Sequence, residues 1–233
     1  CVSWAVGFAA RSYYARMVEH RDTTKIQNIP SPAFLYNATN ETTSDDKPCS
    51  VGSYTDNVLT LLQSGAMSLA DMPYEAGNCP PLTRAQKAAG TDFRIESFYK
   101  VGNWDPRTYL PLSGTVNAIK AELAKGNPVI VGMMLNDTFE NTMYGPGGMV
   151  IWNPGPIQDN ETDGHEVLLV GYDDTQGTFK LLNSWSAEWG DRGFARITYE
   201  GFMNRADEAW VIQMPGDPDI ALKPADFRPD VIE

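Results

Sequence analysis

Three side chains in this sequence have the types needed for nucleophilic catalysis: Cys1, His165 and Asn183. The thiolate is the reactive form of cysteine, and it needs a base that accepts and returns a proton. Histidine suits that exchange near neutral pH, and a third polar group must hold its ring in place. We therefore interpret these residues as a candidate nucleophile, general base and orienting amide.

Cys1 begins an apolar segment that continues through Tyr14 to Val18. The apolar residues recur at steps of three and four, which predicts a helix buried on most faces. The N-terminus of a helix favours an anion, so a cysteine there would be shifted toward its thiolate form. Cysteine is also a common small buried residue. Cys1 alone therefore leaves both interpretations open.

The other two residues lie beside predicted strands. His165 belongs to a polar turn that leads into a run of Val and Leu, and Asn183 follows a second short apolar run. The segment from Gly164 to Tyr172 has the pattern Gly-His-x-Val-x-x-Val-Gly-Tyr. The segment that begins at Asn183 has the pattern Asn-Ser-Trp-x-x-x-Trp-Gly-x-x-Gly-Phe.

With a cysteine upstream, these two motifs make the chain resemble the papain (C1) family of cysteine peptidases. The resemblance extends more weakly from Cys1 to about Met214. Val2 stands where many members have a Trp after the cysteine, which is similar to bacterial members. The Gln-x-x-x-x-Ser stretch that precedes the cysteine in the family is not part of the sequence. We therefore expect the working enzyme to contain residues upstream of Cys1, including this oxyanion-binding Gln.

Helices are expected first and strands later, which indicates an α+β fold. The expected helices cover about 1–18, 53–63, 83–89 and 115–125, and the expected strands cover 93–101, 128–135, 165–172, 178–183, 193–199 and 208–214. Residues 20–52 are predicted to form a long loop, and Ser53 to cap the helix after it.

The resemblance implies a papain-like fold of two subdomains, with the active site in the cleft between them. Residues 1–110 would form a helical left half that carries Cys1. Residues 111–214 would form a β-barrel-like right half that carries His165 and Asn183. Residues 215–233 are expected to form a Pro-rich acidic tail.

The resemblance also implies roles for residues around the catalytic group. Trp185 would shield the bond between His165 and Asn183 from water, and Trp189 completes that motif; core packing is the alternative for both. Gly52 would pair with the substrate backbone. The pocket that sets specificity would be bordered by Gly132, Asp163, Gly164 and Glu166, with Asp207 or Glu208 less securely aligned. Its carboxylates would attract Arg or Lys, unless they are solvated surface groups.

The three cysteines divide into one nucleophile and one pair, Cys49 and Cys79. A disulfide between them would indicate an oxidising compartment, so we expect a secreted or otherwise extracytoplasmic protein. Two free thiols, or pairing with cysteines outside this sequence, are the alternatives. The two histidines and three cysteines have no zinc-ligand spacing, so we expect no metal and no cofactor.

The composition limits the classes of molecule that the protein is expected to bind. The chain has 233 residues and a formal net charge of -12, which argues against nucleic acid and anionic membranes. No apolar run has the length of a membrane span. The expected partners are a peptide or protein substrate and a propeptide or other upstream segment.

The sequence thus predicts a cysteine peptidase that acts through a thioester acyl-enzyme. One alternative is an N-terminal-nucleophile amide hydrolase, in which the α-amine of Cys1 is the base; it would leave both motifs unexplained. A second alternative is a non-catalytic scaffold with a papain-like fold.

Overall fold

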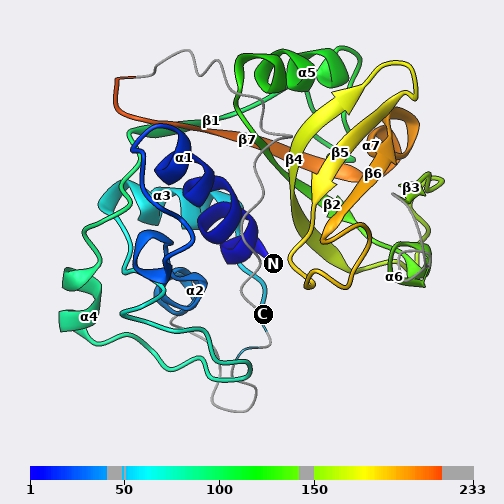
Figure 1. The fold of residues 1–233 in the computed structure, drawn as a ribbon. Coiled ribbons are helices and arrows are strands. Elements are labelled where there is room, and N and C mark those ends of the chain that lie inside the picture. Colours follow the sequence, from blue (N-terminus) through cyan, green and yellow to red (C-terminus); the bar gives the residue numbers. More distant parts are fainter. Residues whose placement is uncertain (41–48, 50, 142–149, 217–233) are drawn as a thin grey trace. The chain divides into compact units, whose positions relative to one another are not determined.

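A computed structural model describes residues 1–40, 49, 51–141 and 150–216 (Figure 1). Its contacts divide the chain into two units. A helical unit contains Val2–Phe98 and residues 212–216, and a β-rich unit contains Cys1 and Tyr99–Val211. The functional division proposed from the sequence, at residues 110 and 214, stays a prediction. The tail expected from 215 onward lies almost entirely outside the described residues.

The helical unit begins with a π-helix, Trp4–Arg11, which continues as α1, Ser12–Met17. Small residues allow this helix to pack closely: a Cβ on Gly7 would come within 2.3 Å of Leu35 Cδ1. Buried Tyr13 fills the core of the unit on the same helix. The expected helix over about 1–18 is therefore present.

The predicted long loop is wrong in its first half, because it contains helix α2, Pro32–Thr39, and a short 3₁₀ turn, Ile26–Asn28. Ser31 is the N-cap of α2, and its hydroxyl accepts from the backbone N–H of Phe34 at 3.1 Å. Pro32 is the first helical residue. Proline is favoured there because the backbone N–H that it lacks would have no partner within the helix. The proline that suggested a loop thus starts a helix.

Two further helices of this unit lie in the described part of the chain. In α3, Thr55–Ser64, the N-cap is Tyr54, with no side-chain cap. The expected cap by Ser53 is wrong, since the Ser53 hydroxyl instead accepts from the side-chain amide of Asn40 at 2.7 Å. In α4, Arg84–Ala89, Thr83 forms the N-cap of a complete capping box, as the short helix expected over 83–89 requires.

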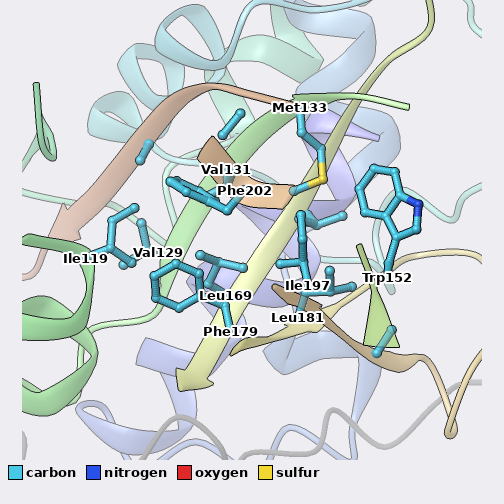
Figure 2. Packing of buried hydrophobic residues seen from close by; sticks show 14 of the residues in the cluster. Ile119, Val129, Val131, Met133, Trp152, Leu169, Phe179, Leu181, Ile197 and Phe202 are labelled. Carbon is cyan, nitrogen blue, oxygen red and sulfur yellow. The ribbon is translucent and has the colours of Figure 1, made fainter. Parts of the chain in front are cut away.

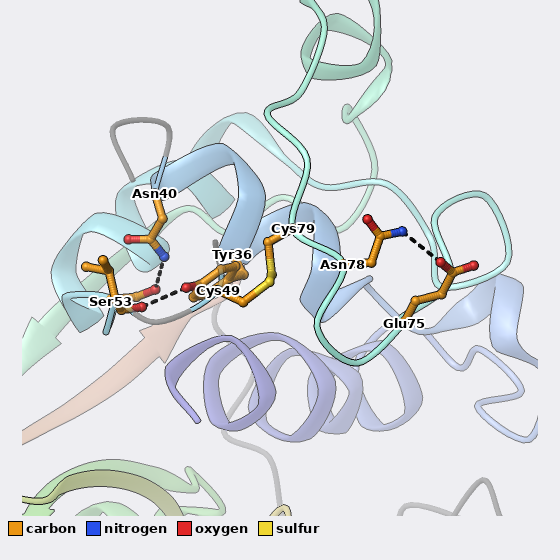
Figure 3. The surroundings of a disulfide bond; sticks show 8 residues. Tyr36, Asn40, Cys49, Ser53, Glu75, Asn78 and Cys79 are labelled. Carbon is orange, nitrogen blue, oxygen red and sulfur yellow. Dashed lines mark hydrogen bonds between the residues drawn. A yellow bond between two sulfur atoms is a disulfide. The ribbon is translucent and has the colours of Figure 1, made fainter. Parts of the chain in front are cut away.

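Cys49 and Cys79 form the expected disulfide, with an S–S distance of 2.04 Å (Figure 3). It lies near α2, where the Tyr36 hydroxyl donates to the carbonyl of Val51 at 2.7 Å. The bridge links the segment that precedes α3 to the segment that precedes α4. A covalent link across 30 residues restricts the unfolded chain and thereby stabilises this loop-rich part of the unit.

The β-rich unit is built on a seven-stranded sheet with the order β1-β7-β2-β4-β5-β6-β3. The strands are β1, Ser97–Lys100; β2, Val129–Met134; β3, Ile151–Trp152; β4, Gly164–Asp173; β5, Thr178–Leu182; β6, Phe194–Thr198; and β7, Ala206–Gln213. β4 pairs antiparallel with β2 and with β5, so it is central to the sheet. Among the described strands the sheet does not close into a barrel, so the barrel-like half is an open sheet.

Three helices accompany the sheet: α5, Thr115–Lys125; α6, Asp137–Asn141; and α7, Tyr199–Arg205. Helix α5 has the expected bounds, and Gly126 is its C-cap. The φ of Gly126 is 95°, a left-handed conformation that glycine adopts without steric strain. Neither α6, α7 nor β3 was expected from the sequence.

The core of this unit lies between α5, α7 and the sheet (Figure 2). Its members share almost complete burial, and they include Ile119, Val131, Leu169, Phe179, Ile197 and Phe202. Burial of such side chains stabilises the sheet by about 1.5 to 3 kcal/mol each. The strands that carry the candidate residues are therefore held rigidly.

In the described part of the chain, no helix combines the length and the apolar character needed to cross a membrane. The same residues contain no group of three or more His, Cys, Asp or Glu side chains arranged to hold a metal ion.

Candidate functional site

His165 and Asn183 meet in a buried hydrogen bond. His165 is the second residue of β4, paired with Met133 of β2, and Asn183 directly follows β5. The His165 Nε2 to Asn183 Oδ1 distance is 2.7 Å, and both residues are only 7% exposed. The sequence expectation that these residues would interact is matched by this contact.

The Asn183 side chain is itself held by the backbone. Its Oδ1 also accepts from the backbone N–H of Ser184 at 2.8 Å, and the backbone N–H of Asn183 donates to the carbonyl of Gly193 at 2.9 Å. An amide oxygen accepts only, so Nε2 of His165 carries the hydrogen, which we assign from its partner. The lone pair of a neutral ring is then on Nδ1, which is the nitrogen left to act as a base.

Aromatic side chains surround the imidazole. The ring centroids of Trp185 and His165 are 4.9 Å apart, and those of Phe139 and His165 are 6.0 Å apart. Fully buried Trp189 packs against Trp185 at 5.9 Å and against Phe139 at 5.1 Å. Both tryptophans of the second motif thus contribute to one wall, with Trp185 in direct contact with the ring.

Phe139 is a member of this wall that the sequence did not reveal. It lies on the short helix α6 and is completely buried. The only local signal is Asn136, whose Oδ1 accepts from the N–H and hydroxyl of Thr138 and so favours a turn into a helix. Nothing in that pattern shows that Phe139 would face His165.

The aromatic wall has an electrostatic consequence. Burial lowers the pKa of His165 to about 4, and the hydrogen bond with Asn183 opposes this shift only in part. Removal from water disfavours the charged imidazolium. At neutral pH the ring is therefore neutral and able to accept a proton.

A second group of candidate residues meets around Gly132 in β2. Gly132 pairs with Glu166 of β4 on one side and with Glu208 of β7 on the other. A Cβ on Gly132 would lie 2.5 Å from Asp207 Oδ1, 2.9 Å from Glu208 Cγ and 3.3 Å from Glu166 Oε2. We call Glu166, Asp207 and Glu208 the carboxylate cluster. Only a residue without a side chain leaves room for all three.

Burial first, and then the negative charge of Glu208, raise the pKa of Asp207 to about 6. Glu166 is 4% exposed. These acids are therefore not ordinary solvated surface groups, which was the alternative for Glu166 and Asp207.

The remaining candidate site residues belong neither to the hydrogen-bonded pair of His165 and Asn183 nor to the carboxylate cluster. Asp163 is exposed, and its carbonyl accepts from the N–H of Leu135 at 2.9 Å; Gly164 follows as the first residue of β4. Gly52 belongs to the helical unit, is exposed, and has no atom within 4 Å of a Cβ placed on it. Cys1 is an exposed free thiol ahead of the first helix.

Known proteins are similar to this chain in sequence or in fold. An uncharacterized peptidase C1-like protein of Acanthamoeba polyphaga mimivirus is 32% identical over 156 residues, which is 66% of this chain and 48% of that protein. The chain thus spans about half the length of this curated relative. Xylellain, a cysteine protease from Xylella fastidiosa, has a similar structure, with a TM-score of 0.69 and 22% identity over 92% of this chain and 79% of its own.

Digestive procathepsin L 3 from the larval midgut of Tenebrio molitor is also similar, with a TM-score of 0.63 and 20% identity over 91% of this chain and 63% of its own. At these identities the two structures show the fold. The model of the family described as "Papain family cysteine protease" matches residues 3–211. Because that match covers most of the sequence, the chain belongs to the papain family of cysteine proteases.

Proposed function

We propose that this protein is a cysteine peptidase in which Cys1 is the nucleophile, His165 the general acid and base, and Asn183 the residue that orients His165. The observation that carries this proposal is the buried 2.7 Å hydrogen bond between His165 Nε2 and Asn183 Oδ1. It assigns the basic lone pair to Nδ1 and fixes the plane of the ring. A histidine whose ring is oriented by a second polar side chain suits the role of a general base.

The reaction would proceed in two halves. The proton of the Cys1 thiol passes to His165, and the sulfur attacks the peptide carbonyl to form a tetrahedral oxyanion. The C–N bond then breaks, His165 gives its proton to the leaving amine, and a thioester remains. Water next gives a proton to His165 and attacks the thioester, which releases the acid and restores the thiol.

The pKa of His165 fits the first step only if a negative charge forms nearby. An imidazolium in this buried place is disfavoured, as the pKa of about 4 indicates. A thiolate beside it would stabilise the imidazolium, so the two groups would titrate as a pair. Trp185 would keep water from the bond between His165 and Asn183.

We further propose that the carboxylate cluster around Gly132 forms the pocket for the substrate residue one position before the one that flanks the scissile bond. Its charge favours Arg or Lys there, through charge-assisted hydrogen bonds. Exposed Asp163 and Gly164 would border the rim, and Gly52 would pair with the substrate backbone.

The wider setting is also a proposal. The disulfide between Cys49 and Cys79 favours a secreted or otherwise extracytoplasmic location. The similarity to procathepsin L 3 suggests control by a propeptide. Peptides and proteins would be the substrates.

Hydrolysis of fluorogenic peptides by the natural protein tests the function. We expect turnover that iodoacetamide removes by labelling Cys1, and no turnover in a Cys1→Ser variant that keeps the wild-type circular dichroism spectrum. Unchanged turnover in Cys1→Ser would refute the assignment. Acetylation of the α-amine should spare activity, whereas loss would favour an N-terminal-nucleophile hydrolase. Iodoacetamide labelling of Cys1 no faster than of a small model thiol would favour a non-catalytic scaffold.

A substrate library tests the pocket. We expect preference for Arg or Lys at the second position, reduced in Glu166→Gln and kept in Asp163→Asn, whose carboxylate is exposed. A preference for Leu or Phe that neither variant changes would rule out the charged pocket.

A further inference from the structure

Arg205 is a buried cation at the end of helix α7, with only 1% of its surface exposed. Its Nε donates to the carbonyl of Gly155 at 2.7 Å, and its Nη2 donates to the carbonyl of Pro156 at 3.2 Å. The guanidinium also binds both carboxylate oxygens of Glu161, with Nη1 to Oε2 at 2.5 Å and Nη2 to Oε1 at 3.3 Å. One side chain thus fixes three positions of the segment 155–161.

Glu161 is fixed from its own side as well. Its Oε2 accepts from the backbone N–H of Gln158 at 2.8 Å, and its N–H donates to the carbonyl of Gln158 at 3.0 Å. Arg205 first, and then the N–H of Gln158, hold the pKa of Glu161 below its usual value. Glu161 is therefore charged at neutral pH. We call the paired Arg205 and Glu161 the Arg205 clamp.

Helix α7 and its N-cap residue, Thr198, bind the start of the same segment. The side-chain amide of Asn204 donates to the carbonyl of Pro154 at 3.1 Å, and the hydroxyl of Thr198 bonds to Asn153 Oδ1 at 2.5 Å. A Cβ on Gly201 would come within 2.5 Å of Pro154 Cδ. Residues 153–154 are thus held by α7 and its N-cap, and residues 155–161 by Arg205 at the end of the helix.

The clamp joins two stretches of chain that enter the carboxylate cluster. Downstream of Glu161 the chain passes Asp163 and enters β4, which carries His165 and then Glu166. Directly after Arg205 the chain enters β7, which carries Asp207 and Glu208. The two sides of the cluster are therefore linked by one bidentate ion pair a few residues before either side.

We propose that Arg205 and Glu161 are positioning residues that set the spacing between Glu166 and the Asp207 and Glu208 side of the cluster, and with it the preference for basic substrates. This inference rests on the proposed function. A merely structural ion pair would lower the activity toward all substrates together when it is weakened. A positioning pair would lower the preference for a charged side chain, because charge-assisted hydrogen bonds depend on geometry.

The test uses Arg205→Lys and Glu161→Gln variants and two peptides that differ only in Arg or Leu at the second position. Lysine keeps the charge but cannot form the bidentate pair or reach all three carbonyl and carboxylate partners. We expect the ratio of kcat/KM for the Arg peptide over the Leu peptide to fall about tenfold in both variants. The kcat for the Leu peptide should stay within about twofold.

Glu122→Gln is the matched control. Glu122 is another buried acid of the β-rich unit, 8% exposed, and it binds the Tyr99 hydroxyl at 2.8 Å, Lys125 at 2.9 Å and Asn127 at 3.0 Å. None of these residues belongs to the carboxylate cluster. Its substitution should lower stability and leave the peptide ratio unchanged.

An equal loss for both peptides in Arg205→Lys would overturn the positioning role. So would a ratio that Glu122→Gln changes as much as Arg205→Lys does. If the wild type cleaves neither peptide, the proposed function fails, and hydrogen exchange then tests the clamp. Faster exchange of the amides of 163–166 in Arg205→Lys, but not in Glu122→Gln, would support it, and unchanged exchange would overturn it.

Discussion

Burial acts on two ionisable groups of the β-rich unit in opposite directions. It lowers the pKa of His165 to about 4 and raises the pKa of Asp207 to about 6. In both cases removal from water favours the neutral form. The same physical effect thus prepares a proton acceptor at one end of β4 and a carboxyl group that titrates close to neutrality beside Gly132.

The two places differ in their hydrogen bonds. Nε2 of His165 is satisfied by Asn183 at 2.7 Å. Oδ1 of Asp207 is buried, and among the described residues no hydrogen bond reaches it. A satisfied buried group defines one geometry, whereas a buried acceptor without a donor costs about 1 to 3 kcal/mol. We infer that the first place is organised for chemistry and the second is open to a donor from the substrate.

The largest expected effect is the difference in kcat between a variant of His165 and a variant of Asp207. We expect His165→Ala to lower kcat by about a thousandfold or more, because the proposed general base is lost. Asp207→Asn should leave kcat for an apolar peptide within about threefold, since Asp207 takes no part in the proposed proton transfers. Steady-state kinetics at pH 7 measure both. Equal losses in the two variants would abolish the distinction.

The pH dependence of stability should report the burial of His165. Its folded pKa of about 4 lies below the unfolded value of 6.5, so the folded state favours the neutral ring. This stabilisation is present above pH 6.5 and is lost as the pH falls toward 4. The loss amounts to about 3 kcal/mol in the free energy of unfolding.

Urea unfolding of the wild type and of His165→Gln at pH 7.5 and pH 4 measures this difference. The glutamine cannot titrate, so its variant should lose about 3 kcal/mol less over the same range. All other groups titrate alike in both proteins. Parallel pH profiles would show that His165 is not buried as described.

Asn183→Ala should remove the orientation of His165 while keeping its chemistry. We expect kcat to fall about a hundredfold, less than for loss of the imidazole, because the ring remains but its Nε2 has no partner. KM should change little. Asn183→Asp offers a comparison, because it retains an acceptor for the ring. A full rate in Asn183→Ala would show that the aromatic wall alone holds His165.

Much of the fold could be predicted because local patterns and tertiary packing agree there. The capping box at Thr83 and the terminating glycine at Gly126 are visible in a few neighbouring residues, and both helices are present. Helix α7 was missed because Gly201 interrupts it, and glycine weakens a helix. The structure explains this glycine, since Pro154 leaves no space for a larger residue.

The site divides in the same way. His165 and Asn183 could be identified because each belongs to a motif of fixed spacing, and the hydrogen bond between them is present. The place of Phe139 beside the imidazole was not visible, because it depends on how α6 packs rather than on local spacing. The pair of Arg205 with Glu161, 44 residues apart, was missed for a similar reason. Arg205 lies on α7 and Glu161 between β3 and β4, so their contact depends on the packing of elements that are distant in the sequence.

The smallest expected effect concerns the stability cost of Asp207, and its sign is opposite to that of His165. Its folded pKa of about 6 exceeds the ordinary value of 3.8, so the folded state favours the protonated carboxyl. That stabilisation is present below pH 3.8 and is lost as the pH rises through 6. Asp207 is partly exposed, so solvent screening reduces the cost of its charge to about 1 to 2 kcal/mol.

Asp207→Asn should therefore be more stable than the wild type by this amount at pH 8, with little difference at pH 3.5. Urea unfolding at both pH values measures the gain, and Asp163→Asn, which changes an exposed carboxylate, should show none. A gain of the same size at both pH values would indicate a packing effect and contradict a buried charge at Asp207.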